Sequence, residues 1–280
     1  MYDPQTPSFP HFARFDALDE AAPTDFLAAL LAGCAQALAD GTVPALHRGL
    51  ALFAKALLLD ETRPEPHVGM GLCYANLGDD DRAIRHFDLC LALGFGQGDY
   101  AELVYEYDGP DGETWVVDIA EEQVLLWRAG CQVSLGKAEL AKRDLERVSR
   151  SVDPDIRAQS SVVWATIHLF SGSLDAAQRQ LGQALALDPD NPQAHFVRGR
   201  IHEQRGRISS AIKAYNRAIK LDAEAAEFQV ARARVFLAAG DPGSARSDLH
   251  AAENLLSQQL PQPKLIAEIA QIQHAIDNRG

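Results

Sequence analysis

The chain of 280 residues contains 39 acidic and 26 basic residues, so its formal net charge is −13. A protein this acidic lacks the basic footprint that nucleic-acid binding requires, and we therefore expect no nucleic-acid partner. Hydrophobic residues make up 47% of the sequence and charged residues 23%, which is typical of a folded globular protein and excludes a chain that is wholly disordered.

The charge is unevenly distributed. Residues 1–127 contain 22 acidic and 6 basic residues, whereas residues 128–280 contain 17 acidic and 20 basic residues. We therefore expect two regions of different electrostatic potential along the molecule, the first acidic and the second close to neutral.

Several sequence features bear on the cellular location. The sequence contains no apolar run that approaches the ~20 residues of a membrane span, so we expect no membrane partner. Residues 1–4 are neither basic nor followed by an apolar stretch, unlike a signal peptide, and we predict a cytoplasmic protein. The four cysteines form no CxxC pair, which favours reduced, buried thiols over a disulfide or metal framework.

The first segment, residues 1–23, is rich in proline and aromatic residues and has no helical periodicity. This composition predicts an extended N-terminal arm. The arm is either disordered or packed through its aromatic side chains on the first helices, and the sequence leaves both alternatives open.

From residue 24 onward an internal repeat organises the chain. Gly172, Gly206 and Gly240 follow one another at a constant interval, and each is followed at the same spacing by a small, a bulky and a small residue. These trios are Ala177/Leu181/Ala184, Ala211/Tyr215/Ala218 and Ala245/Leu249/Ala252. The pattern recurs after Gly78 and Gly136, and a degraded copy lies around Gly49 and Phe53. Apolar residues recur at helical spacing on both sides of each glycine, which predicts a helix, a tight turn and a second helix per unit.

The spacing predicts twelve paired helices near residues 24–39, 44–59, 64–77, 80–93, 119–135, 138–150, 155–171, 174–187, 192–205, 208–221, 224–239 and 242–257. A further helix near 263–278 has a single apolar stripe and is predicted to cap the last repeat.

An insertion at about residues 99–118 interrupts the repeat. Residues 101–107 and 113–117 are β-prone and flank the turn sequence 108–112, which predicts a β-hairpin. Asp118 followed by Glu121 predicts a capping box at the start of the next helix.

The repeat period of about 34 residues, the turn glycine and the small/bulky/small trio together resemble the tetratricopeptide repeat family. The resemblance covers roughly residues 24–257 and implies an all-α fold, a right-handed solenoid of about six helix-turn-helix repeats spanning residues 24–280, with the hairpin as an insertion. A solenoid of this kind holds another chain on its concave surface.

By this resemblance, the first helix of each repeat lines the concave surface. The groove residues would be Val68, Leu72, Leu126, Val133, Val162, Thr166, Phe170, Phe196, Arg200, Val230 and Arg234. They would form an apolar groove with a basic C-terminal end, so we expect a protein or peptide partner with apolar anchors and an acidic end. The alternative is that the arginines are solvated or paired with neighbouring acids.

A second contact patch is expected on the hairpin, formed by the aromatic residues Tyr105, Tyr107 and Trp115. The alternative is that these aromatic side chains fold back on adjacent helices. The clamp of lysine, asparagine and arginine by which one subset of the family holds a C-terminal carboxylate is missing here.

The sequence predicts no catalytic residues, cofactor or metal. It contains no P-loop, no GxSxG, GxGxxG or HExxH motif, and no Cys/His cluster; His168 and His202, which lie one repeat apart, are expected to be packed histidines. We therefore predict a non-catalytic scaffold or adaptor. Two alternatives stay open: a regulatory or substrate-recruiting subunit of an enzyme complex, and a scaffold that self-associates.

Overall fold

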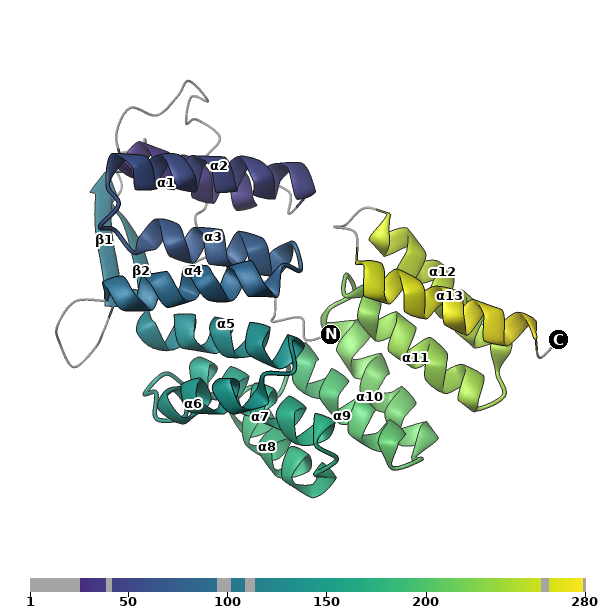
Figure 1. The fold of residues 1–280 in the computed structure, drawn as a ribbon. Coiled ribbons are helices and arrows are strands. Elements are labelled where there is room, and N and C mark those ends of the chain that lie inside the picture. Colours follow the sequence, from purple (N-terminus) through teal and green to yellow (C-terminus); the bar gives the residue numbers. More distant parts are fainter. Residues whose placement is uncertain (1–25, 39–41, 95–101, 109–113, 258–261, 279–280) are drawn as a thin grey trace. The chain divides into compact units, whose positions relative to one another are not determined.

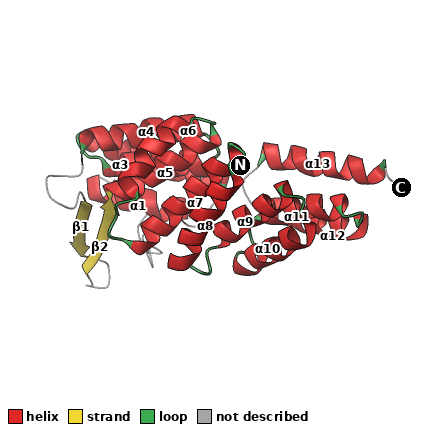
Figure 2. Cartoon of the chain, turned by 90° about the horizontal axis from the view of Figure 1, so that it is seen from below, coloured by secondary structure: helices red, strands yellow, loops and turns green. Residues whose placement is uncertain are grey.

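The computed structural model describes residues 26–38, 42–94, 102–108, 114–257 and 262–278, which contain thirteen helices and two strands (Figures 1 and 2). The chain divides into two compact units, Met1–Ser151 and Val152–Gly280. We refer to them as the N-terminal unit and the C-terminal unit. None of the helices in these described ranges is both long and apolar enough to cross a membrane.

The N-terminal unit contains three helix pairs and one β-hairpin. Its elements are α1 (Phe26–Leu38), α2 (Val43–Leu59), α3 (Glu65–Asn76), α4 (Asp80–Leu93), β1 (Glu102–Asp108), β2 (Thr114–Ala120), α5 (Glu121–Ser134) and α6 (Ala138–Val148). Each first helix packs on its own second helix, and α3 also contacts α1 and α5.

The C-terminal unit contains three further helix pairs and a final single helix. Its elements are α7 (Pro154–Phe170), α8 (Leu174–Leu187), α9 (Pro192–Gln204), α10 (Ile208–Leu221), α11 (Ala226–Ala238), α12 (Pro242–Leu256) and α13 (Pro263–Asp277). The first helices stack in the order α7, α9, α11 and α13. The predicted all-α fold of six helix-turn-helix repeats with a hairpin insertion and a capping helix is therefore confirmed, and the helix ends lie within two residues of those predicted.

The turn inside a repeat depends on a glycine with positive φ. Five of the glycines that join a first helix to its second helix have φ between 66° and 81°: Gly78, Gly136, Gly172, Gly206 and Gly240. Because other residues adopt this conformation only at a steric cost, the glycine ends the first helix and directs the chain back along it.

The small/bulky/small trio of each second helix forms the centre of the repeat, as the spacing predicts. Phe87 and Tyr215 are fully buried. A methyl group on Gly71 would overlap the ring of Phe87, and one on Gly199 would overlap the ring of Tyr215. The first helix therefore carries a glycine where the second helix carries an aromatic ring, which lets the two helices approach closely.

The hairpin β1–β2 is antiparallel, with Glu102 opposite Ala120 and Tyr107 opposite Trp115. Its second strand continues to Ala120, so Asp118 lies in the strand and not at a helix N-terminus. The predicted capping box is therefore wrong: α5 begins at Glu121, and its N-cap residue, Ala120, provides no side-chain hydrogen bond.

The final helix, α13, completes the core of the C-terminal unit. Four of its apolar residues, Leu265, Ile269, Ile272 and Ile276, are buried in one cluster with Val230, Leu237 and Leu249. This helix covers the apolar face of the last repeat, which is the role of a terminal cap in a repeat protein.

Candidate functional site

Most of the predicted groove residues are buried in the structure. Eight of the eleven are at most 8% exposed: Val68, Leu72, Leu126, Val133, Val162, Thr166, Phe196 and Val230. In this conformation their side chains contribute to helix packing and offer little surface to another molecule. Val230, for example, packs in the cluster that contains α13.

Three of the predicted groove residues remain accessible, and all three lie in the C-terminal unit. Phe170, at the last position of α7, is 53% exposed. The Cζ atom of Arg200, on α9, lies 5.0 Å from the centre of the Phe170 ring, within the range of a cation–π contact. Arg234, on α11, is partly exposed as well.

Arg200 forms no ion pair with any residue between 152 and 257 or between 262 and 278, nor with the described part of the N-terminal unit. Burial lowers the pKa of its guanidinium, and the positive charge of Arg234 lowers it further, against the opposing effect of Tyr215, Glu203 and Glu227. A half-buried guanidinium that lies against an aromatic ring and has no ion-pair partner among the described residues retains N–H groups that can donate to an anion.

Arg234 differs from Arg200 because its guanidinium is already occupied. Its Nε donates to Glu203 Oε1 at 2.7 Å and its Nη2 to Glu203 Oε2 at 3.0 Å. A third nitrogen pairs with Glu268 on α13. Tyr215 also donates to Glu203, at 2.8 Å. Burial alone would raise the pKa of Glu203, but the hydrogen bonds and charge of Arg234 outweigh it and lower that pKa.

Glu227, on α11, likewise forms no ion pair with a described residue. It accepts a hydrogen bond from Nε2 of the buried Gln193 at 3.1 Å. Burial raises the pKa of Glu227, with the nearby charge of Arg200 acting in the opposite direction. The carboxylate is thus held by the Gln193 amide, and no cation among the described residues forms an ion pair with it.

These six residues, Phe170, Gln193, Arg200, Glu203, Glu227 and Arg234, are here called the Arg200 cluster. Together with Glu268 the cluster contains two arginines and three glutamates, so this end of the predicted groove is not basic. Sequence reasoning missed the glutamates, although Glu203 follows Arg200 by three residues on one helix and Glu227 follows Gln193 by one repeat.

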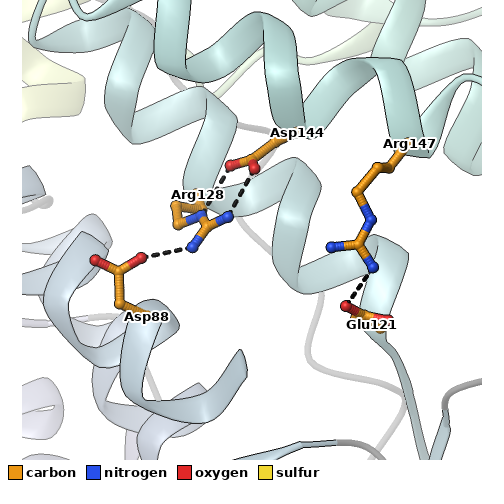
Figure 3. A network of polar contacts seen from close by, with 5 residues as sticks. All are labelled: Asp88, Glu121, Arg128, Asp144 and Arg147. Carbon is orange, nitrogen blue, oxygen red and sulfur yellow. Dashed lines mark hydrogen bonds and ion pairs between the residues drawn. The ribbon is translucent and has the colours of Figure 1, made fainter. Parts of the chain in front are cut away.

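Two other arginines on first helices, Arg128 and Arg232, are held in ion pairs that join helices. Arg128 on α5 donates two hydrogen bonds to Asp144 on α6, at 2.8 and 2.6 Å, and one to Asp88 on α4 (Figure 3). Arg147 and Glu121 form a second contact between α5 and α6 in the same view. The Arg128 arrangement recurs in the C-terminal unit, where Arg232 donates twice to Asp248 and once to Asn216.

Histidines form a polar cluster in the N-terminal unit. Nδ1 of His67 on α3 lies 3.0 Å from Nδ1 of His86 on α4, so one ring must donate and the other accept. Burial lowers the pKa of both rings, that of His86 to about 4.

In the C-terminal unit, His168 stacks on Trp164, and Nδ1 of His202 is buried. No group of three or more potential metal ligands occurs among the residues described.

The remaining candidate residues fall partly outside the description. Tyr105, Tyr107 and Trp115 lie on the paired strands, but their side chains are outside the described part of the structure, so the second contact patch stays a prediction. The N-terminal arm, residues 1–23, is also outside the described residues. Cys34, Cys73, Cys90 and Cys131 are free and buried, as predicted.

Comparisons with known proteins agree with the repeat architecture. A family model described as Tetratricopeptide repeat matches residues 162–226 and 204–254. A search of curated protein sequences finds no match.

Among solved structures, a tetratricopeptide repeat protein from Parabacteroides merdae is 16% identical, with a TM-score of 0.66, and the match covers 92% of this chain and 86% of that one. The APC/C hetero-tetramer Cut9–Hcn1 gives 17% identity and a TM-score of 0.62 over 90% of this chain and only 43% of the matched chain. An IFIT1 monomeric mutant solved with Gppp-AAAA gives 16% identity and 0.60 over 81% of this chain and 50% of its own. At these identities the likeness shows the fold alone.

Proposed function

Because the chain is a tetratricopeptide repeat protein, we propose that it is a non-catalytic scaffold or adaptor that binds a protein or peptide segment at the Arg200 cluster. The family is generally non-catalytic, and its fold supports protein–protein interaction. The observation that carries the proposal is the exposed Phe170 ring beneath the guanidinium of Arg200, which has no ion-pair partner in the described residues.

The chemistry of this pair selects the kind of segment. An arginine whose Cζ lies over a ring and that forms no ion pair with a described residue can donate two parallel hydrogen bonds from its planar guanidinium to a carboxylate. The exposed part of the Phe170 ring offers apolar surface beside it. The proposed partner therefore carries an acidic residue next to an apolar one. The sequence suggested that Arg200 and Arg234 both bind the acidic end of the partner, and the proposal assigns this role to Arg200 alone.

A protein partner is favoured over a nucleic acid. The chain carries a net charge of −13, and Glu203 and Glu227 lie within electrostatic range of Arg200. The repeated phosphates of a nucleic-acid backbone would be repelled by these carboxylates. A single carboxylate on a peptide needs only the free edge of one guanidinium. A cytoplasmic location stays a prediction from sequence.

The proposal is tested with the full chain on a synthetic array of blocked ten-residue peptides that vary in charge and apolar content. We expect capture of peptides with an aspartate or glutamate beside a leucine or phenylalanine. Phe170→Ala and Arg200→Ala should each weaken this capture at least fivefold, and Arg179→Ala, an exposed arginine on α8, should not. Failure to bind any peptide, or identical binding by all variants, would overturn the proposal.

Self-association is a second candidate, favoured by one observation in the N-terminal unit. Leu58 and Leu59 at the end of α2, and Leu89 and Leu93 at the end of α4, are each at least 44% exposed. Light scattering over a hundredfold range of protein concentration tests this candidate, because a scaffold that self-associates gains mass with concentration and a monomeric adaptor does not. Catalytic turnover by the purified chain alone would contradict both candidates. It would also contradict the alternative of a regulatory or substrate-recruiting subunit of an enzyme complex.

A further inference from the structure

We propose that the segment bound at Arg200 also carries a basic residue, a lysine or arginine, which pairs with Glu227. This inference rests on the proposed function and specifies the partner: an extended peptide with an acidic and a basic residue about three residues apart, one for each charge of the Arg200 cluster.

The first argument is the contrast between the two glutamates of the cluster. Glu203 is satisfied by two bonds from Arg234 and one from Tyr215. Glu227 accepts the 3.1 Å bond from Gln193, and no lysine, arginine or histidine in the described residues forms an ion pair with it. A half-buried carboxylate without an ion-pair partner among the described residues would be stabilised by a cation that a ligand supplies.

The second argument is the placement of the two charges along α9. Gln193, which holds Glu227, lies near the first turn of α9, and Arg200 lies seven residues later. Seven residues of α-helix rise about 10 Å. A peptide in the polyproline II conformation rises about 3.1 Å per residue and has three residues per turn, so side chains three residues apart lie on one face and would reach the two charges together.

The third argument is charge selectivity. Arg200 and Glu227 influence each other's protonation but do not approach within ion-pair distance, so each keeps its own bonding capacity. A peptide with two acids would place the second one against Glu227, and a peptide with two bases would place one against Arg200. Like charges placed against each other are destabilising. The site therefore discriminates between peptides by the sign of their charges and by the order of those charges along the peptide.

The test uses the acidic peptide selected on the array, rebuilt with blocked termini in three forms. The first form carries lysine three residues from the acid, the second carries norleucine there, and the third exchanges the acid and the lysine. Affinities for wild type, Glu227→Gln, Arg200→Ala and the control Glu146→Gln, an exposed residue on α6, are measured by titration calorimetry at pH 7.5.

We expect wild type to bind the lysine peptide about tenfold more tightly than the norleucine peptide, and Glu227→Gln to abolish this difference. Glu146→Gln should keep it. Because Glu227 must be ionised to attract the lysine, the lysine preference should also shrink as the pH falls, while the Arg200 contribution persists.

Equal affinities for the lysine and norleucine peptides in wild type would overturn the inference, and so would a lysine preference that survives in Glu227→Gln. In both cases the proposed function stands if Arg200→Ala still weakens binding. If Arg200→Ala binds every form as wild type does, the proposed function fails first and the inference fails with it.

Discussion

Arginines serve two different purposes in two regions of the molecule. In two helix pairs, Arg128 and Arg232 on the first helix each bind an aspartate at the same position of the second helix. These aspartates are Asp144 and Asp248, and the arginine and aspartate side chains of both ion pairs are largely buried. In the Arg200 cluster, Arg200 lies over the Phe170 ring and forms no ion pair with any residue that the structure describes. The comparison shows that the residue type alone does not determine the role: Arg128 and Arg232 face a carboxylate across the helix pair, whereas Arg200, at a different position of its repeat, faces an aromatic ring.

Arg198 illustrates the same rule within the C-terminal unit. It occupies the position of Arg128 and Arg232 in its own repeat, but the matching position of its second helix holds Ala214. Arg198 instead contacts His195 on its own helix, at 2.6 Å. Without the aspartate, the bond that joins the two helices of the pair is absent at this position.

The largest expected effect comes from breaking a paired arginine. Asp144→Ala leaves Arg128, 18% exposed, with only Asp88 as a partner, and should lower the free energy of unfolding by about 3 kcal/mol. Chemical denaturation measures the change. The exposed pair Lys142–Glu139 is the control, and Glu139→Ala should cost less than about 0.5 kcal/mol. Equal losses in the two variants would contradict the distinction between buried and surface pairs.

A somewhat smaller loss is expected from Gly199→Ala, next to Arg200 on α9. The added methyl group overlaps the Tyr215 ring, which should lower the free energy of unfolding by about 2 kcal/mol and disturb the Tyr215 bond to Glu203. Thermal unfolding reports the loss. Gly182→Ala on α8 meets open space, and this helical substitution should stabilise the protein by about 0.5 kcal/mol. A neutral Gly199→Ala would show that α9 is not held closely by Tyr215.

A pH-dependent effect is expected where a histidine takes the place of the aspartate of the Arg–Asp pairs. His86 occupies the position of Asp144 and Asp248 in its repeat and faces His67. The pKa of His86 is about 4 in the folded chain and near 6.5 when unfolded, so the unfolded state binds more protons between these values. Stability should be full above pH 6.5 and fall by about 1 kcal/mol as the pH drops towards 4.

Denaturation midpoints between pH 4 and 7 measure this loss, and His86→Asn should reduce it. His195 and His202, whose pKa values are also lowered by burial, provide a residual slope in the variant. An unchanged slope in His86→Asn would mean that the histidine pair does not titrate as the structure implies.

The fold could be predicted from sequence because its determinants are local and periodic. The turn glycines, such as Gly172 and Gly206, and bulky residues such as Tyr215 recur once in every repeat, so each repeat supports the interpretation of the others. The start of α5 could not be predicted, because β2 extends to Ala120 through pairing with Glu102, a contact between residues far apart in the sequence.

The candidate site could be predicted only in part, for a physical reason. Periodicity places Phe170, Arg200 and Arg234 on first helices, but it does not indicate which side chains cover them. Arg234 is occupied because Glu203 and Glu268 reach it from two other helices, and Val230 is buried by α13. Long side chains on neighbouring helices decide what remains accessible, and this depends on rotamers that no spacing encodes.

The central claim is that the free edge of Arg200 binds a carboxylate. It is tested most directly by a double-mutant cycle in which the array-selected peptide and its analogue with asparagine or glutamine for the acid are titrated into wild type and Arg200→Ala. We predict that Arg200→Ala weakens binding of the acidic peptide about tenfold and leaves the affinity of the amide analogue nearly unchanged. Equal losses for the two peptides would contradict the account, because Arg200 would then act without regard to the charge of its partner.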